Sequence, residues 1–96
     1  MATIDITRNH NLGIDAGKER AATLADSMKE KLGIAWRWDG DRIKFDAPSG
    51  MAKGTTGTIT VGASSVRVEI DLPFLLRAMK GTIEQKVNEK LDKSLA

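Results

Sequence analysis

The stretch LPFLLRAMKGTIEQKVNEKL, residues 72–91, decides how this chain folds. Within it and just beyond, an apolar residue recurs at every fourth position, with charged residues between: Met79, Ile83, Val87, Leu91 and Leu95. This spacing predicts an amphipathic helix and not a strand. Because a step of four overshoots one helical turn by roughly 40°, the apolar stripe rotates by about 160° from Met79 to Leu95. One flat sheet cannot cover both ends of such a stripe, so we expect one end to face something other than the chain's own sheet.

The first part of this stretch leaves two interpretations open. Gly81 costs an unbroken helix about 1 kcal/mol relative to alanine, and Thr82-Ile83-Glu84-Gln85 fits the capping-box pattern. These features predict a break near Gly81, between a short helical turn over about 74–80 and a longer helix over 83–95. The alternative is a continuous helix that uses Gly81 for close packing.

Two hairpins precede this stretch. Segment 34–45 predicts a hairpin with Gly40-Asp41 as its loop, because a leading glycine suits a type II′ turn. In this register the apolar side chains share one face: Trp36, Trp38, Ile43 and Phe45. Segments 55–61 and 66–72 form the second hairpin, with Val61 opposite Val66. One of its faces is apolar and the other polar, so we expect a sheet that both helices cover on the same side.

The remaining segments complete the expected topology. Residues 3–8 alternate as a strand, and a helix with Asp15 as its N-cap runs from about 15 to 32, where Gly33 ends it. Residues 47–54 have no periodicity and predict a loop. The chain therefore predicts a single two-layer α+β domain over 1–96, β-α-β-β-β-β-α, with a five-stranded antiparallel sheet and two helices on one face. From the hairpins we expect the strand order 2-3-4-5-1.

Composition excludes several kinds of chemistry. The chain has no cysteine, which removes disulfides and thiolate metal sites, and its single histidine, His10, cannot form a multi-histidine site. We expect His10 to serve a turn or cap, and we expect no catalytic residues, no metal and no cofactor. The 15 basic and 13 acidic residues are interspersed, which argues against a nucleic-acid partner. No segment predicts a signal peptide or a membrane span, so we expect a cytoplasmic protein.

Two apolar groups are candidate binding surfaces. Phe74, Leu75 and Leu76 are either buried under the first helix or exposed as a patch for a partner. With them we group the later part of the stripe and its flanking lysines: Lys86, Lys90, Leu91 and Leu95. The second group comprises Trp36, Trp38 and Phe45, which form either the core or a ligand face.

Several short motifs, each weak alone, occur in a specific order and spacing. They are His10-Asn11-Leu12-Gly13, Trp38-Asp39-Gly40-Asp41, Gly57-Thr58-Ile59, Val66-Arg67-Val68 and Lys80-Gly81-Thr82-Ile83-Glu84. In these motifs the chain resembles the polyhydroxyalkanoic acid system proteins, a family of small granule-region proteins of bacteria. The resemblance implies a cytoplasmic accessory protein of polyhydroxyalkanoate metabolism, with no established catalytic residues, whose partner is the storage granule or a granule-associated protein.

The order of elements is also similar to a shortened helix-grip domain. This likeness implies an alternative function, a small protein that binds an acyl or lipid-type ligand between the tryptophan hairpin and the last helix. A homodimer formed through the last helix is compatible with either function.

Overall fold

The computed structural model describes residues 3–48, 50 and 53–95. Its elements follow the predicted order: β1 (Ile4–Asn9), α1 (Gly13–Leu32), β2 (Ala35–Asp39), β3 (Arg42–Asp46), β4 (Thr56–Val61), β5 (Ser65–Asp71), the 3-10 helix η1 (Phe74–Met79) and α2 (Lys80–Ser94). Residues 49, 51 and 52 of the predicted loop 47–54 lie outside the described residues.

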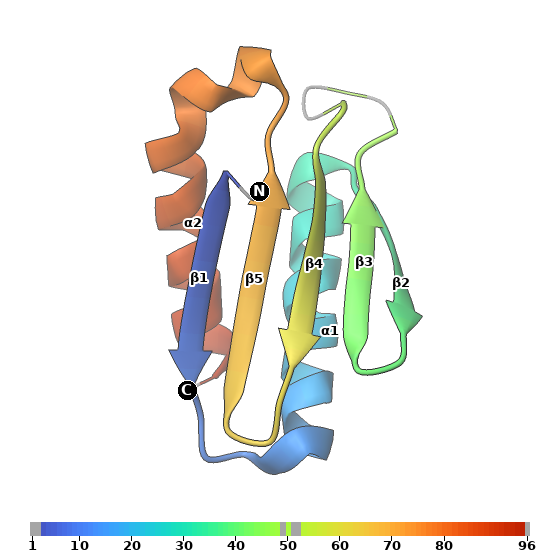
Figure 1. Cartoon of the computed structure of the whole chain (residues 1–96), viewed down its shortest axis with the longest axis vertical. Coiled ribbons are helices and arrows are strands. Elements are labelled where there is room, and N and C mark those ends of the chain that lie inside the picture. Colours follow the sequence, from blue (N-terminus) through green and yellow to red (C-terminus); the bar gives the residue numbers. More distant parts are fainter. Residues whose placement is uncertain (1–2, 49, 51–52, 96) are drawn as a thin grey trace.

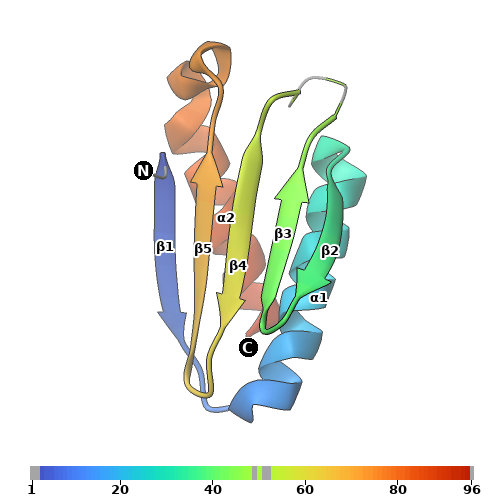
Figure 2. The same cartoon turned by 45° about the vertical axis from the view of Figure 1, so that its right-hand side comes forward.

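The strands form one antiparallel sheet in the order β1-β5-β4-β3-β2, as predicted. Both helices cover the same face of the sheet, α1 behind β3 and β4 and α2 behind β1, and they run in opposite directions (Figures 1 and 2). The other face carries no helix. The two-layer α+β prediction is therefore confirmed.

Both hairpin registers are confirmed. Trp36 lies opposite Phe45 in the first hairpin, and Val61 lies opposite Val66 in the second. Gly40 has φ +64°, whereas no described non-glycine residue has a positive φ. Positive φ at the first loop position alone is what a type II′ turn requires, so the leading glycine fixes this register.

The core lies between the sheet and the two helices. Its fully buried side chains come mainly from inward positions of the strands, with Leu24 from α1 and Leu91 from α2: Ile4, Leu24, Ile43, Ile59, Ile70, Leu91, Val66 and Val68. Burying each such side chain stabilises the fold by about 1.5–3 kcal/mol. Gly57 of β4 leaves room for the ring of Phe45, since a Cβ there would lie 2.3 Å from Phe45 Cζ.

The tryptophans contribute less to the core than the sequence predicts. Trp38 is 40% exposed and Trp36 is half-buried, whereas Phe45 on the adjacent strand is buried. The reason is that β2 is an edge strand, so only part of its inward face lies under α1. The indole N–H of Trp36 donates to Asp26 Oδ1 on α1 at 3.1 Å, which keeps the polar edge of that ring satisfied.

Both predicted helix starts were wrong. Helix α1 begins at Gly13 after Leu12, without a side-chain cap, and Asp15 lies in its first turn. Its predicted end is correct, because Gly33 has φ +69°. Helix α2 includes Gly81, and the change from 3-10 to α geometry falls at Met79, with φ −99° and ψ 10°.

The short helical turn predicted over about 74–80 is present as η1, and the break predicted near Gly81 lies two residues earlier, at Met79, whereas the close-packing alternative is wrong. A Cβ on Gly81 would meet nothing within 4 Å. The penalty for glycine is only about 1 kcal/mol, small enough for the contacts made by the rest of α2 to override.

Candidate functional site

The 3-10 helix η1 carries the most exposed apolar side chains of the described residues. It connects β5 to α2 at one end of the molecule (Figure 1). Phe74 is 82% exposed, Leu75 87% and Met79 44%. We call these three residues the apolar pole. A surface of this kind is typical of an interaction site.

The geometry of η1 explains which residues are exposed. A 3-10 helix has three residues per turn, so side chains three positions apart share a face. Leu76 packs against the core, and Phe74 and Leu75 consequently point away from it. The predicted burial of 74–76 under the first helix is therefore wrong for two of the three residues, and the predicted exposed patch is correct for those two.

A groove lies beside the apolar pole, between the C-terminal end of α1 and the start of α2. Its volume is about 400 Å³. Leu32 of α1 and Ile83 of α2 form part of its walls, and Leu76 and Met79 close the end nearest η1. Lys31 and Lys86 lie among its lining residues. We call this space the pole groove.

One buried polar group lies among the lining residues of the pole groove. Thr55 is 3% exposed, and its Oγ1 has no hydrogen-bond partner among the described residues. A buried hydroxyl left without a partner costs about 1–3 kcal/mol. The backbone at Thr55 is held by a hydrogen bond, which Ala47 N–H donates to the Thr55 carbonyl at 2.8 Å.

The rotating stripe on α2 has one uncovered end, as predicted, but it is the opposite end from the one assigned to a partner. Val87 and Leu91 are 4% and 1% exposed, and Leu95 packs partly against the core, whereas Met79 is 44% exposed. Leu91 is thus a core residue and offers no contact surface.

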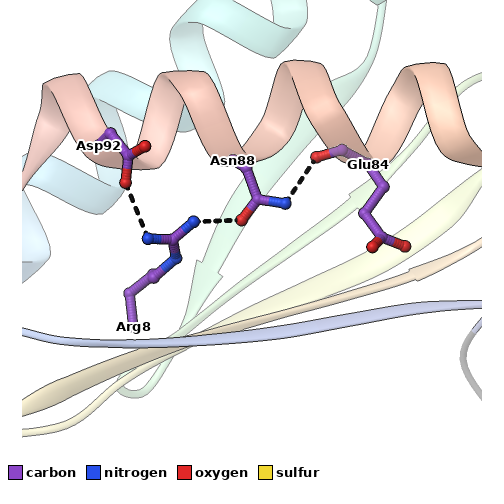
Figure 3. A network of polar contacts seen from close by, with 4 residues as sticks. All are labelled: Arg8, Glu84, Asn88 and Asp92. Carbon is purple, nitrogen blue, oxygen red and sulfur yellow. Dashed lines mark hydrogen bonds and ion pairs between the residues drawn. The ribbon is translucent and has the colours of Figure 1, made fainter.

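A polar network joins the C-terminal half of α2 to β1, beside the buried Val87 and Leu91 (Figure 3). Arg8 of β1 donates from Nη1 to Asp92 Oδ1 at 2.8 Å and from Nη2 to Asn88 Oδ1. The Asn88 amide in turn donates to the Glu84 carbonyl at 3.1 Å. Arg8 points inward from the end of an edge strand, and this orientation places its guanidinium under α2.

Three lysines that line the pole groove or the cleft beyond it are free of salt bridges within the described residues. None of the ion pairs found there includes Lys31, Lys86 or Lys90. Lys86 lines the pole groove, and Lys90 lines a smaller cleft that continues along the two helices. These cations leave the rim of the apolar surface positively charged.

The structure places the second predicted group, Trp36, Trp38 and Phe45, away from the last helix. Helix α2 packs against α1, η1 and β1, whereas the tryptophan hairpin lies on the far side of α1 (Figure 1). Phe45 fills the space above Gly57 inside the core. The ligand site expected between this hairpin and the last helix is therefore wrong, because α1 occupies that place.

His10 serves a turn, as predicted. It is buried, and its Nδ1 accepts a hydrogen bond from Leu12 N–H at 3.1 Å. Since Nδ1 accepts, the proton is assigned to Nε2, which lies 3.2 Å from the Gly62 carbonyl and can donate to it. The imidazole thus connects the turn before α1 to the turn between β4 and β5. The described residues contain no cluster of three or more His, Asp or Glu side chains arranged to hold a metal ion.

The two side chains whose pKa values are shifted, Asp5 and Arg67, lie on the face of the sheet without helices, and neither belongs to the apolar pole. Arg67 donates from Nε and Nη2 to the two carboxylate oxygens of Asp5, at 3.0 and 2.7 Å. These hydrogen bonds lower the pKa of Asp5 and raise that of Arg67. The pair joins neighbouring strands β1 and β5 and has a structural role.

Fold and surface together define a small two-layer α+β protein with an exposed apolar pole and a basic rim. Residues 4–95 match the family described as "Putative polyhydroxyalkanoic acid system protein", and the chain belongs to that family. The resemblance found in the sequence motifs is thereby confirmed. No curated protein and no solved structure matches the chain. Among the described residues, neither helix has the length and hydropathy that crossing a bilayer requires.

Sequence reasoning missed the part of the site that α1 contributes. Lys31 and Leu32 line the pole groove only because the end of α1 packs beside the start of α2, and no local pattern signals this contact. Met79 and Ile83 could be recognised from the sequence, since both belong to the rotating apolar stripe.

Proposed function

We propose that this protein is a non-catalytic, cytoplasmic accessory protein of polyhydroxyalkanoate metabolism that attaches to the surface of the polyester granule through its apolar pole. The observation that carries the proposal is the exposure of Phe74 and Leu75, at 82% and 87%, in a family linked to the polyhydroxyalkanoic acid system.

The energetics are consistent with reversible attachment. Burying one large apolar side chain contributes about 1.5–3 kcal/mol, so Phe74 and Leu75 together supply a weak anchor. The lysines on the rim can extend their ammonium groups toward water while their alkyl chains lie on the apolar surface. One molecule would exchange on and off a granule, and a granule would carry many molecules.

The test is co-sedimentation of the purified protein with polyhydroxybutyrate particles. We expect the Phe74→Asp/Leu75→Asp variant to lose binding, because it places two carboxylates where the apolar contact forms. The matched control is Ile14→Asp, which changes another exposed apolar residue, 38% exposed, in the first turn of α1. That turn lies at the end of the molecule opposite η1 (Figure 1), so the control should bind like the wild type.

Two outcomes would overturn the proposal. One is a wild-type protein that stays in the supernatant, and the other is a double variant that sediments as well as the control. A parallel run without particles shows whether the protein sediments by itself. Light scattering at several protein concentrations detects a homodimer formed through the pole, because the mass would rise with concentration.

A further inference from the structure

We infer that the pole groove binds the tail of one anionic hydroxyacyl chain, with its hydroxyl on Thr55 and its carboxylate near Lys31 and Lys86. The groove and its polar groups carry this inference. The choice of a hydroxyacyl chain over a plain fatty acid rests on the proposed function.

The shape of the groove fits one small ligand. Its volume of about 400 Å³ lies within the usual range of ligand pockets, about 300–1,000 Å³. Most of its lining is apolar and comes from α1, β5, η1 and α2: Met28, Leu32, Ile70, Leu76, Met79 and Ile83. Phe74 and Leu75 do not line it. The groove and the most exposed part of the pole are therefore separate surfaces that can be tested separately.

Thr55 lies among the residues that line the groove, and its hydroxyl is buried in the free protein, so a ligand hydroxyl reaches Oγ1 only when the Thr55 side chain turns toward the groove. Its buried hydroxyl lacks a partner among the described residues, and polar groups in a protein interior are nearly always hydrogen-bonded. A ligand hydroxyl can both donate to and accept from Thr55 Oγ1, whereas an alkyl chain can do neither. This contact favours a chain that carries an oxygen along its length.

The charge on the groove selects the head group. Lys31 and Lys86 line it from opposite helices, and neither is in a salt bridge within the described part of the chain. An apolar groove with two free cations complements an alkyl chain that ends in a carboxylate, and it disfavours a cationic amphiphile.

The experiment is a titration of the ¹⁵N-labelled protein with sodium 3-hydroxydecanoate, followed by NMR. Sodium decanoate lacks the hydroxyl, and decyltrimethylammonium reverses the charge. We expect saturable chemical-shift changes of the backbone amides of Thr55, Met79 and Ile83. We expect none at the indole N–H groups of Trp36 and Trp38, which lie in the β2–β3 hairpin outside the groove.

Thr55→Val is the decisive variant, because valine keeps the branched shape and replaces the hydroxyl with a methyl group. We expect it to weaken 3-hydroxydecanoate binding about three- to tenfold and to leave decanoate binding unchanged. The free protein should be at least as stable as the wild type, since no buried hydroxyl remains unpaired. This stability measurement shows whether a loss of binding comes from misfolding.

The lysines are tested with a matched pair of variants. Lys31→Gln/Lys86→Gln should weaken both anionic ligands several-fold, whereas Lys29→Gln/Lys80→Gln removes two exposed lysines of the same helices that lie outside the groove and should have no effect.

Several results would overturn the inference. One such result is an absence of chemical-shift changes, or changes dispersed over the surface. Another is an affinity for decyltrimethylammonium equal to that for 3-hydroxydecanoate. A third is a Thr55→Val variant that loses the same fraction of its affinity for both acids. A protein whose mass doubles on concentration, with loss of the titration shifts, would place a second copy in the groove instead. The Phe74→Asp/Leu75→Asp variant separates the two proposals, because it should still bind 3-hydroxydecanoate but should no longer bind polyhydroxybutyrate particles.

Discussion

Two glycines, each followed by Thr-Ile, should respond in opposite ways to substitution by alanine. A Cβ on Gly57 would lie 2.3 Å from Phe45 Cζ and 2.6 Å from the Glu69 carbonyl oxygen, and a Cβ on Gly81 would meet nothing within 4 Å. We expect Gly57→Ala to lower the free energy of unfolding by about 1–3 kcal/mol through overpacking. Gly81→Ala should raise it by up to about 1 kcal/mol, because alanine favours a helix interior.

Urea denaturation of both variants measures this difference. A stabilised Gly57→Ala protein would mean that the ring of Phe45 does not occupy the space above β4. A destabilised Gly81→Ala protein would mean that α2 does not continue through residue 81.

The Asp5–Arg67 pair predicts a specific effect of pH. The hydrogen bonds from Arg67 hold the pKa of Asp5 below its ordinary value of 3.8. We expect Arg67→Gln to raise the pKa of Asp5, as measured by the ¹³C shift of its carboxyl group during titration. An unchanged pKa would show that the pair does not form in solution.

The sign of the stability effect follows from the lowered pKa. Because the folded state holds the Asp5 proton less tightly than the unfolded state, the pair stabilises the fold above the unfolded pKa. This contribution is lost as the pH falls through the folded pKa. The stability of wild type and Arg67→Gln should therefore converge in acid, below the ordinary range of aspartate.

At the scale of elements, the strands were predictable because their signals are local. Alternation sets which side chains of β4 and β5 face inward, and Gly40 sets the register of the first hairpin. The start of α1 was not predictable in this way. It begins after Leu12, whose N–H is bonded to His10, and a helix start that depends on a histidine two residues earlier has no common sequence signature.

Helix α2 gives the sharpest prediction about an element. Leu91 is 1% exposed and Leu75 is 87% exposed, although both lie in the same amphipathic stretch. Leu91→Ala should lower the free energy of unfolding by about 2–5 kcal/mol, as cavity-forming substitutions do, whereas Leu75→Ala should change it by less than about 0.5 kcal/mol. Thermal or chemical unfolding of the two variants makes the comparison. Similar losses in both would mean that η1 is buried.

At the scale of the molecule, the sequence correctly predicted that one end of the α2 stripe would be uncovered, but the end assigned to a partner, at Leu91 and Leu95, was the wrong one. The covered end is the one that packs on the core and meets Arg8 of β1, and the uncovered end follows the 3-10 turn, and neither arrangement has a local signal in the sequence. The pole groove was less predictable still. It exists only where α1, β5, η1 and α2 meet, and Thr55 carries no signal beyond its place at the start of a strand.

The exposure of the apolar pole also predicts how substitutions there affect the unfolding temperature of the whole molecule. Because Phe74 and Leu75 contribute little to the core, Phe74→Asp/Leu75→Asp should unfold at the wild-type temperature within about 2 °C. Differential scanning calorimetry tests this expectation. A large fall in the unfolding temperature would show that η1 is required for folding, and the loss of granule binding would then need a milder variant.

The sheet has two open edges, β1 and β2, and both are unsuited to joining another sheet. Arg8 turns a charge inward at the end of β1, and β2 has five residues, with Arg37 and Asp39 exposed among them. Short edges and charges of this kind oppose strand-to-strand polymerisation. On the granule surface that we propose as its partner, crowded copies would therefore form a coat of separate molecules, each able to leave as the particle shrinks, and not a fibrous shell.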